Sequence, residues 1–312
     1  MPEPKRKPEN ILRRLEWTVI RRLDGLLHGD YRTLFRGAGV DLADLREYQF
    51  HDDVRHIDWN VTARLNVPHV RQYNEDREIT AWFLLDLSPS VDFGSLEATK
   101  RSMLVEFVTV MSRILTRHGN KVGAIFYGGS VDWVIPARGG RLHVLHILNT
   151  LMSRPELPQA PATKLRDLLQ AGFQIIKRRS LVFVVSDFVS EPGWSKPLSL
   201  LARRHEMLAV RVFDPLEMEL PDLGLLMMRD AETGENLFVD THDRGFRKRF
   251  AREAERRETE LRTGLQQAGV DAIELSTDDD LVDAILRFAD LRKHRSRISG
   301  GGGTKKQVGG VP

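Results

Sequence analysis

Two long apolar runs constrain the fold of this chain more than any other feature of its sequence. ITAWFLLDL (79–87) and SLVFVVSDF (180–188) are apolar at most of their positions. A strand with one face in water alternates apolar and polar residues, so these runs indicate strands that are buried on both faces. Stretches with apolar residues at helical spacing lie between the predicted strands. The sequence therefore predicts an α/β fold: a mostly parallel, Rossmann-like central sheet flanked by helices.

The same two periodicities predict the remaining elements. Further strands are expected at 121–129, 131–138, 205–215 and 271–276. Helices are expected at 10–28, 96–117, 143–152, 165–178, 195–204, 243–267 and 279–292. A hairpin is expected within 222–242. This pattern predicts four parts: an N-terminal helix and loop (1–39), a charged accessory segment (40–78), an α/β domain (79–292) and a disordered basic, glycine-rich tail (293–312).

The accessory segment 40–78 has short extended pieces near 57–59 and 69–73 and is dense in charge. It is too short to bury a core alone, so we expect a small β-rich region and hypothesise that it pairs with the 222–242 hairpin. Its acids and histidines allow two interpretations, a second metal site or a salt-bridged surface. The accompanying arginines favour the surface for this set, which is His51, Asp52, Asp53, His56 and Asp58.

Composition excludes several classes of protein. The chain has no cysteine, which excludes disulfides, thiolate metal sites and cysteine nucleophiles. No apolar stretch reaches the roughly 18 residues of a membrane helix, and the N-terminus lacks the apolar segment of a signal peptide. A soluble, cytoplasmic protein is therefore expected. The formal charge of +3 comes mainly from basic residues at the two ends. We interpret these ends as solvated; nucleic-acid binding through them is the alternative, without a recognised motif to support it.

Oxygen-bearing side chains follow both apolar runs. Asp86, Ser88 and Ser90 follow the first, and Ser186 and Asp187 follow the second. Ligands of open α/β sheets bind beyond the carboxyl ends of the strands. Two carboxylates at one edge repel each other unless a cation lies between them, and serine hydroxyls add neutral hard ligands. The set suits a small divalent ion such as Mg²⁺ or Mn²⁺.

The spacing Asp86-x-Ser88-x-Ser90 resembles the metal-ion-dependent adhesion site of von Willebrand factor A domains. That site also uses a threonine on a later loop and an aspartate after a following strand. Thr163 and Asp187 stand at the matching places here. The resemblance implies that all five residues are direct or indirect metal ligands. The chain departs from the pattern at Phe188, where the family commonly has glycine.

The segment from 37 to 94 resembles a bacterial family called domain of unknown function 58. The block HDDVRHIDWNVTAR (51–64) carries the likeness, and PARGGRLHVL (136–145) supports it. Members have a von Willebrand A-like domain and are commonly encoded beside AAA+ ATPases of the MoxR type. The resemblance implies a protein-binding module that acts as adaptor or co-chaperone of such an ATPase.

Other interpretations of the same residues remain open. Serine and aspartate after a strand often only cap the next helix. A metal-dependent hydrolase or phosphatase could also use Asp86, but the position of a general acid two residues later holds Ser88. The chain has neither a G-x-x-x-x-G-K-[ST] phosphate loop nor a G-x-S-x-G nucleophile motif. We therefore expect a binding protein rather than an enzyme.

Overall fold

The computed structural model describes residues 7–26, 45–49, 54, 57, 59–71, 79–94, 98–155, 162–229 and 236–300. The chain divides into two compact units, one formed by residues 36–78 and the other by residues 1–35 and 79–312. Each is described by itself. In the described part of the chain, no helix is long and apolar enough to cross a membrane.

The smaller unit contains a two-stranded antiparallel sheet, β1 (Leu45–Glu47) with β2 (His69–Arg71), and one helix, α4 (Trp59–Leu65). The prediction of an extended segment at 57–59 is wrong. Ile57 forms an isolated bridge with Val70, and Trp59 begins a helix. The sequence of this helix, WNVTARL, contains neither proline nor glycine. The acids and histidines at positions 51–53, 56 and 58 lie outside the described residues.

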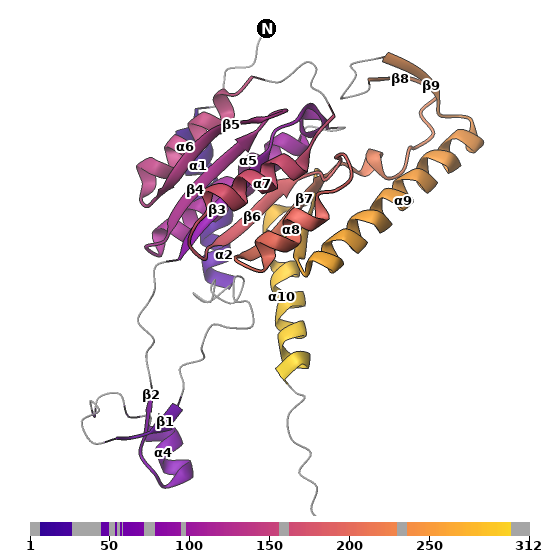
Figure 1. Ribbon diagram of the computed structural model, residues 1–312. Helices are drawn as coiled ribbons and strands as arrows, with labels where there is room; N and C mark the ends of the chain where they lie inside the picture. The colour runs from indigo at the N-terminus through magenta and orange to yellow at the C-terminus, as the bar shows by residue number, and fades with distance from the viewer. Residues whose placement is uncertain are drawn as a thin grey trace, which may run out of the picture. The chain divides into compact units, whose positions relative to one another are not determined.

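The larger unit is built on a six-stranded sheet in the order β10-β7-β6-β3-β4-β5 (Figure 1). Its strands are β3 (Thr80–Asp86), β4 (Lys121–Tyr127), β5 (Val131–Arg138), β6 (Leu181–Ser186), β7 (Glu206–Phe213) and β10 (Asp271–Ser276). All neighbours are parallel except β4 and β5. Pro136 is tolerated in β5 because this strand lies at the edge of the sheet. The predicted α/β fold class is confirmed.

The two apolar runs form β3 and β6, which are neighbours in the middle of the sheet. Alternate side chains of β3 enter different cores: Phe83 packs on one face and Leu84 on the other. Phe83 stacks on Phe183 of β6, with ring centroids 4.9 Å apart. Burial on both faces explains why neither strand alternates with polar residues.

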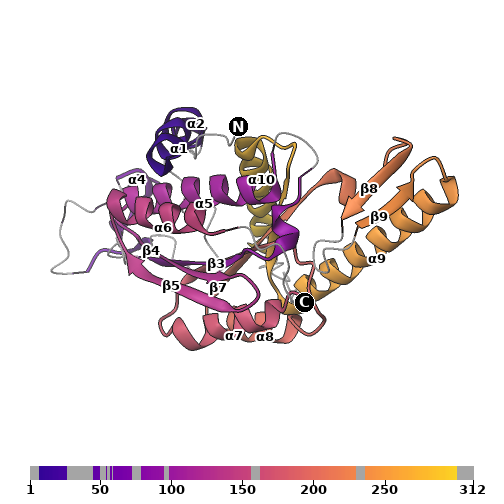
Figure 2. The ribbon, with the colours of Figure 1, turned by 90° about the horizontal axis from the view of Figure 1, so that it is seen from above.

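Helices cover both faces of the sheet (Figure 2). The first face carries α1 (Pro8–Leu15), α2 (Arg21–Leu26), α5 (Lys100–Arg117), α6 (Arg141–Ser153) and α10 (Leu281–Gly300). The second carries α7 (Leu165–Ile175), α8 (Ser195–Ala202) and part of α9 (Arg244–Ala268). Between α1 and α2 the chain makes a π-helical turn, Glu16–Ile20. The wider turn brings Ile20 onto the same buried face as Leu15, five residues earlier.

Two features differ from the sequence-based expectations. β8 (Leu225–Arg229) pairs with β9 (Asn236–Asp240), and β1 pairs with β2, so the hypothesised pairing of the accessory segment with the hairpin is not among the described strand pairs. Helix α10 continues to Gly300 rather than ending at 292. Its extension KHRSRIS contains no proline or glycine, and lysine and arginine are good helix formers.

Candidate metal centre

The carboxyl ends of β3 and β6 meet at one edge of the sheet because the two strands are parallel neighbours. Asp86 ends β3 and is fully buried. Its Oδ2 accepts a hydrogen bond from the Ser186 hydroxyl of β6 at 2.7 Å, and its Oδ1 accepts one from the Ser88 amide at 3.0 Å. These two bonds fix the carboxylate between the strand ends.

A tight turn places two hydroxyls beside Asp86. A 3-10 helix, η3 (Pro89–Asp92), begins directly after Ser88, and Pro89 suits its first turn. Within this turn the Ser88 and Ser90 hydroxyl oxygens lie 3.1 Å apart, and both residues are buried. The side chain of Ser88 caps no backbone amide of that helix. The helix-cap interpretation therefore fails for Ser88.

The environment of Asp86 disfavours the charged form of its carboxyl group. Burial raises its pKa from 3.8 to about 6, with a further contribution from the Asp187 carboxylate, while the hydrogen bonds from Ser186 and Ser88 lower it only in part. Among the described residues, no lysine, arginine or histidine pairs with Asp86. This carboxylate is thus held by neutral donors alone.

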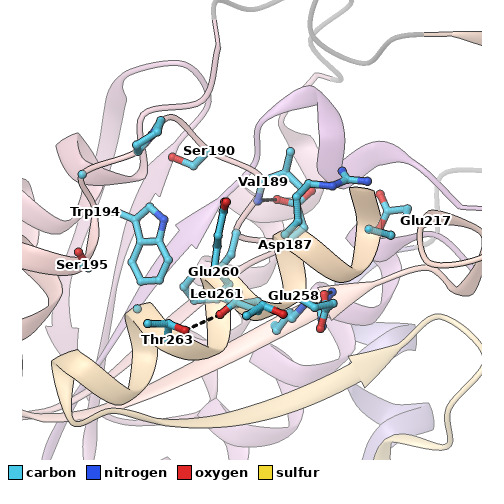
Figure 3. Close-up of a pocket in the computed structure, with 18 of the residues that line it drawn as sticks. Asp187, Val189, Ser190, Trp194, Ser195, Glu217, Glu258, Glu260, Leu261 and Thr263 are labelled. Carbon is cyan, nitrogen blue, oxygen red and sulfur yellow. Dashed lines mark hydrogen bonds and ion pairs between the residues drawn. The ribbon is translucent and has the colours of Figure 1, made fainter. Parts of the chain in front are cut away.

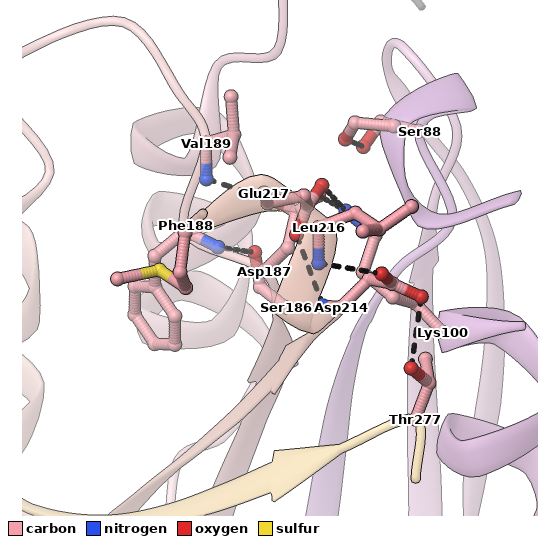
Figure 4. A network of polar contacts seen from close by, with 12 residues as sticks. Ser88, Lys100, Ser186, Asp187, Phe188, Val189, Asp214, Leu216, Glu217 and Thr277 are labelled. Carbon is pink, nitrogen blue, oxygen red and sulfur yellow. Dashed lines mark hydrogen bonds and ion pairs between the residues drawn. The ribbon is translucent and has the colours of Figure 1, made fainter. Parts of the chain in front are cut away.

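Asp187 lies in a different electrostatic setting (Figure 4). Its Oδ1 accepts a hydrogen bond from the Val189 amide at 3.0 Å, and its Oδ2 accepts one from Lys100 Nζ at 2.8 Å. Lys100 is fully buried, and its ammonium also donates to Glu217 Oε1 at 2.6 Å. Burial lowers the pKa of Lys100, but the two carboxylates outweigh it and hold the pKa above its ordinary value.

Thr163 reaches the same edge through backbone contacts. Its carbonyl accepts hydrogen bonds from the Glu191 amide at 2.9 Å and the Ser190 hydroxyl at 3.0 Å, both on the loop that follows Asp187. The next amide, that of Lys164, donates to the Tyr127 hydroxyl at 2.9 Å. Tyr127 ends β4 and is paired in register with Asp86. These contacts bring the Thr163 segment beside the ends of β4 and β6.

The side chains suit a divalent cation. Asp86, Asp187 and Glu217 contribute three carboxylates against the single ammonium of Lys100, so negative charge is in excess at this edge of the sheet. The ligands on offer are carboxylate and hydroxyl oxygens, the type that Mg²⁺ and Mn²⁺ prefer. The buried Asp86, without a cation of its own, is the group that gains most from such an ion.

The sequence identified the residues of the two strand ends but missed Lys100 and Glu217. One signal could have pointed to Lys100. It is the first residue of α5, directly after the Thr99 cap, where the helix dipole disfavours a positive charge. Glu217 follows β7, in a short 3-10 helix, η4 (Pro215–Glu217), and no sequence spacing links it to the other site residues.

Comparison with known proteins identifies relatives of the chain. A family model described as "Protein of unknown function DUF58" matches residues 44–260. An uncharacterised protein of Mycobacterium tuberculosis is 37% identical over 289 residues, which cover 93% of this chain and 90% of that protein. An uncharacterised protein of Mycobacterium avium is 33% identical over 166 residues, which cover 53% of this chain and 97% of that protein.

Among solved structures, this chain is similar to an aerotolerance-related membrane protein from Bacteroides fragilis. The TM-score is 0.45 at 13% identity, with 69% of this chain and 99% of that chain covered. BatB from Bacteroides thetaiotaomicron gives a TM-score of 0.42 at 12% identity, with 72% and 100% covered. Likeness at this level does not extend to function.

Proposed function

The chain belongs to the family of proteins of unknown function DUF58, and we propose that it is a metal-ion-dependent protein-binding module. One observation carries the proposal: among the described residues the buried Asp86 has neutral donors but no cationic partner, and it lies beside Asp187 and the paired hydroxyls of Ser88 and Ser90. A pure helix cap needs neither a second carboxylate nor a desolvated charge.

In this proposal Asp86, Ser88, Ser90, Thr163 and Asp187 hold one Mg²⁺ or Mn²⁺, directly or through water. The bound ion supplies a coordination position that accepts an acidic side chain of a partner. Asp187 already uses one oxygen for Lys100 and the other for Val189, so it suits contact through water. The Ser186 hydroxyl keeps the Asp86 carboxylate oriented toward the turn.

The partner we propose is an AAA+ ATPase of the MoxR type, for which this chain would act as adaptor or co-chaperone, presenting a client protein for assembly or maturation. Support for the partner comes from the likeness of residues 37–94 to a family commonly encoded beside such ATPases. Support for the contact comes from the chemistry of the site, since an acidic side chain on a metal ion makes a strong, directional bond.

A pull-down with the MoxR-type ATPase of the same organism tests this function. Binding is expected in Mg²⁺, and it should be lost in EDTA and with Asp86→Ala. Asp132→Ala is the matched control, because Asp132 is an exposed carboxylate on β5 that pairs with Arg154. Binding that survives both EDTA and Asp86→Ala would count against a metal-dependent contact.

A further inference from the structure

A cavity of about 460 Å³ begins at the candidate metal centre and runs away from it along α9 (Figure 3). Asp187 and Glu217 line the end next to the centre, and Ala254 to Gln267 of α9 line one side. These fourteen residues of helix span roughly 20 Å. The cavity is thus an elongated groove rather than a round pocket, and about six residues of extended chain would span that length.

The opposite side of the groove carries two aromatic rings among polar residues such as Ser190 and Ser195. It consists of the loop after Asp187, with Phe188 and Trp194 among its members. The two rings meet edge to face, with centroids 5.5 Å apart. Trp194 lies so close to α9 that a Cβ added to Gly264 would come within 2.7 Å of its ring. Glycine at this position lets the indole pack against the helix and fixes the width of the groove.

Phe188 is held in a strained backbone conformation. Its φ is 60°, in the left-handed region that glycine adopts without cost but a bulky side chain rarely adopts. Such a conformation is strained and is typical of functional sites. This conformation turns the chain directly after Asp187, and the Phe188 ring packs edge to face on Trp194 at the side of the groove.

The charges on the groove are mostly balanced from within. Glu258 pairs with Arg211, Glu260 with Arg256, and Glu217 with Lys100. An occupant would therefore meet apolar surface, these ion pairs and the exposed side chain of Arg257 along the groove. A negative group of the occupant is expected at the metal end, where it completes the coordination.

We propose that this groove binds an extended segment of the partner protein, in which an acidic residue reaches the metal ion and the neighbouring large apolar residues lie against Phe188 and Trp194. This inference rests on the proposed function and deepens it, because it names the kind of sequence that the site recognises. Asp187 joins the two halves, since it belongs to the metal centre and also lines the groove.

The test uses the full chain and a phage-displayed library of random peptides of about 12 residues, selected in Mg²⁺. Enriched peptides should share an Asp or Glu followed or preceded, within a few positions, by a large apolar residue.

The binding of a synthetic peptide with the enriched sequence is then measured by fluorescence anisotropy. Trp194→Ala should weaken its binding about tenfold, the order expected for truncating a central aromatic contact. Trp133→Ala should not, because Trp133 is an exposed tryptophan of β5 outside the groove.

Thr263→Trp gives a second, independent variant. Thr263 is exposed and lines the groove, so a larger side chain there blocks the groove without removing a core contact. It should also weaken the peptide about tenfold while Mg²⁺ affinity stays unchanged. Thermal unfolding of both variants checks that they fold, and Thr263→Trp decides the test if Trp194→Ala does not.

The outcomes separate the two proposals. Peptides that carry only an acidic residue and bind Trp194→Ala and Thr263→Trp like the wild type would overturn the groove and leave the metal-dependent function intact. Apolar peptides that need Trp194 but bind equally in Mg²⁺, in EDTA and to Asp86→Ala would contradict the metal-dependent contact and the acidic part of this inference. A library that yields no peptide sensitive to Thr263→Trp also overturns the inference.

Discussion

Asp86 and Asp187 lie at the ends of neighbouring strands at one edge of the sheet, but the two carboxylates have different partners. Asp187 has an internal cation, the buried ammonium of Lys100. Among the residues that the structure describes, Asp86 has only serine side chains and a backbone amide as donors, and burial raises its pKa to about 6. Both carboxylates are buried at the same edge of the sheet, so burial alone does not explain the difference between them. The difference distinguishes a carboxylate with an internal ion pair from one for which we propose an external cation.

The largest expected effect comes from breaking the internal pair. Asp187→Ala removes one of the two carboxylate partners of a fully buried ammonium. Loss of a partner from a buried ion pair costs about 3–5 kcal/mol, so the free energy of unfolding without metal should fall by about 3 kcal/mol. Chemical denaturation measures it.

Two further variants sharpen this result. Lys100→Met combined with Asp187→Leu removes both charges and should recover part of the loss, because the uncompensated charge is gone. Glu253→Gln breaks an exposed ion pair on α9 and should leave stability close to that of the wild type. A double variant as unstable as the sum of the single ones would show that Lys100 and Asp187 are not coupled.

The second effect concerns the pH dependence caused by Asp86. Its pKa is 3.8 in the unfolded chain and about 6 in the fold, so the folded state binds more protons between these values. Stability without metal should therefore fall as pH rises from about 4 to about 6, by up to roughly 3 kcal/mol. Asp86→Asn lacks this group, and the difference between the two proteins isolates its contribution.

Comparison of wild type with Asp86→Asn tests whether the pKa of Asp86 is raised in the fold. Wild type and Asp86→Asn should be closest in stability near pH 4 and should diverge by pH 7, with the variant more stable. Parallel stability curves across this range would mean that Asp86 titrates normally. In that case the carboxylate would already have a counter-charge, and the contrast with Asp187 would disappear.

The smallest effect comes from a buried base. His205 is buried, and neither ring nitrogen has a hydrogen-bond partner among the described residues. Burial lowers its pKa, with a smaller contribution from Arg204. Its contribution to stability is present above pH 6.5 and is lost as pH falls below that value, opposite in direction to Asp86.

Comparison of wild type with His205→Met between pH 5 and 7 checks this. The wild type should lose more stability on acidification than the variant does. If the variant loses as much, protonation of His205 does not oppose folding. Opposite pH dependences of stability for His205 and Asp86 would demonstrate that burial disfavours charge of either sign in this protein. Lys100 is the exception, because its two carboxylate partners stabilise its charge.

The sequence predicts the strands well and the site only in part, for physical reasons. β3 and β6 can be predicted from the sequence because burial on both faces removes polar residues from a strand. Asp86 and Asp187 can then be predicted as site residues from their positions at the ends of those strands. The start of α5 offers a signal for Lys100, but its pairing with Asp187 and Glu217 is not readable from the sequence, since both partners are distant along the chain. The start of α4 and the end of α10 were missed because charged segments without proline or glycine fit helix and coil alike.

The most direct test of the central claim is isothermal titration of Mg²⁺ and Mn²⁺ into wild type and Asp86→Asn at pH 8, where the Asp86 carboxyl is ionised. The account predicts one ion per chain for the wild type, no binding to the variant, and a rise in the unfolding temperature on ion binding in the wild type alone. Equal binding to both proteins, or none to the wild type, would contradict it.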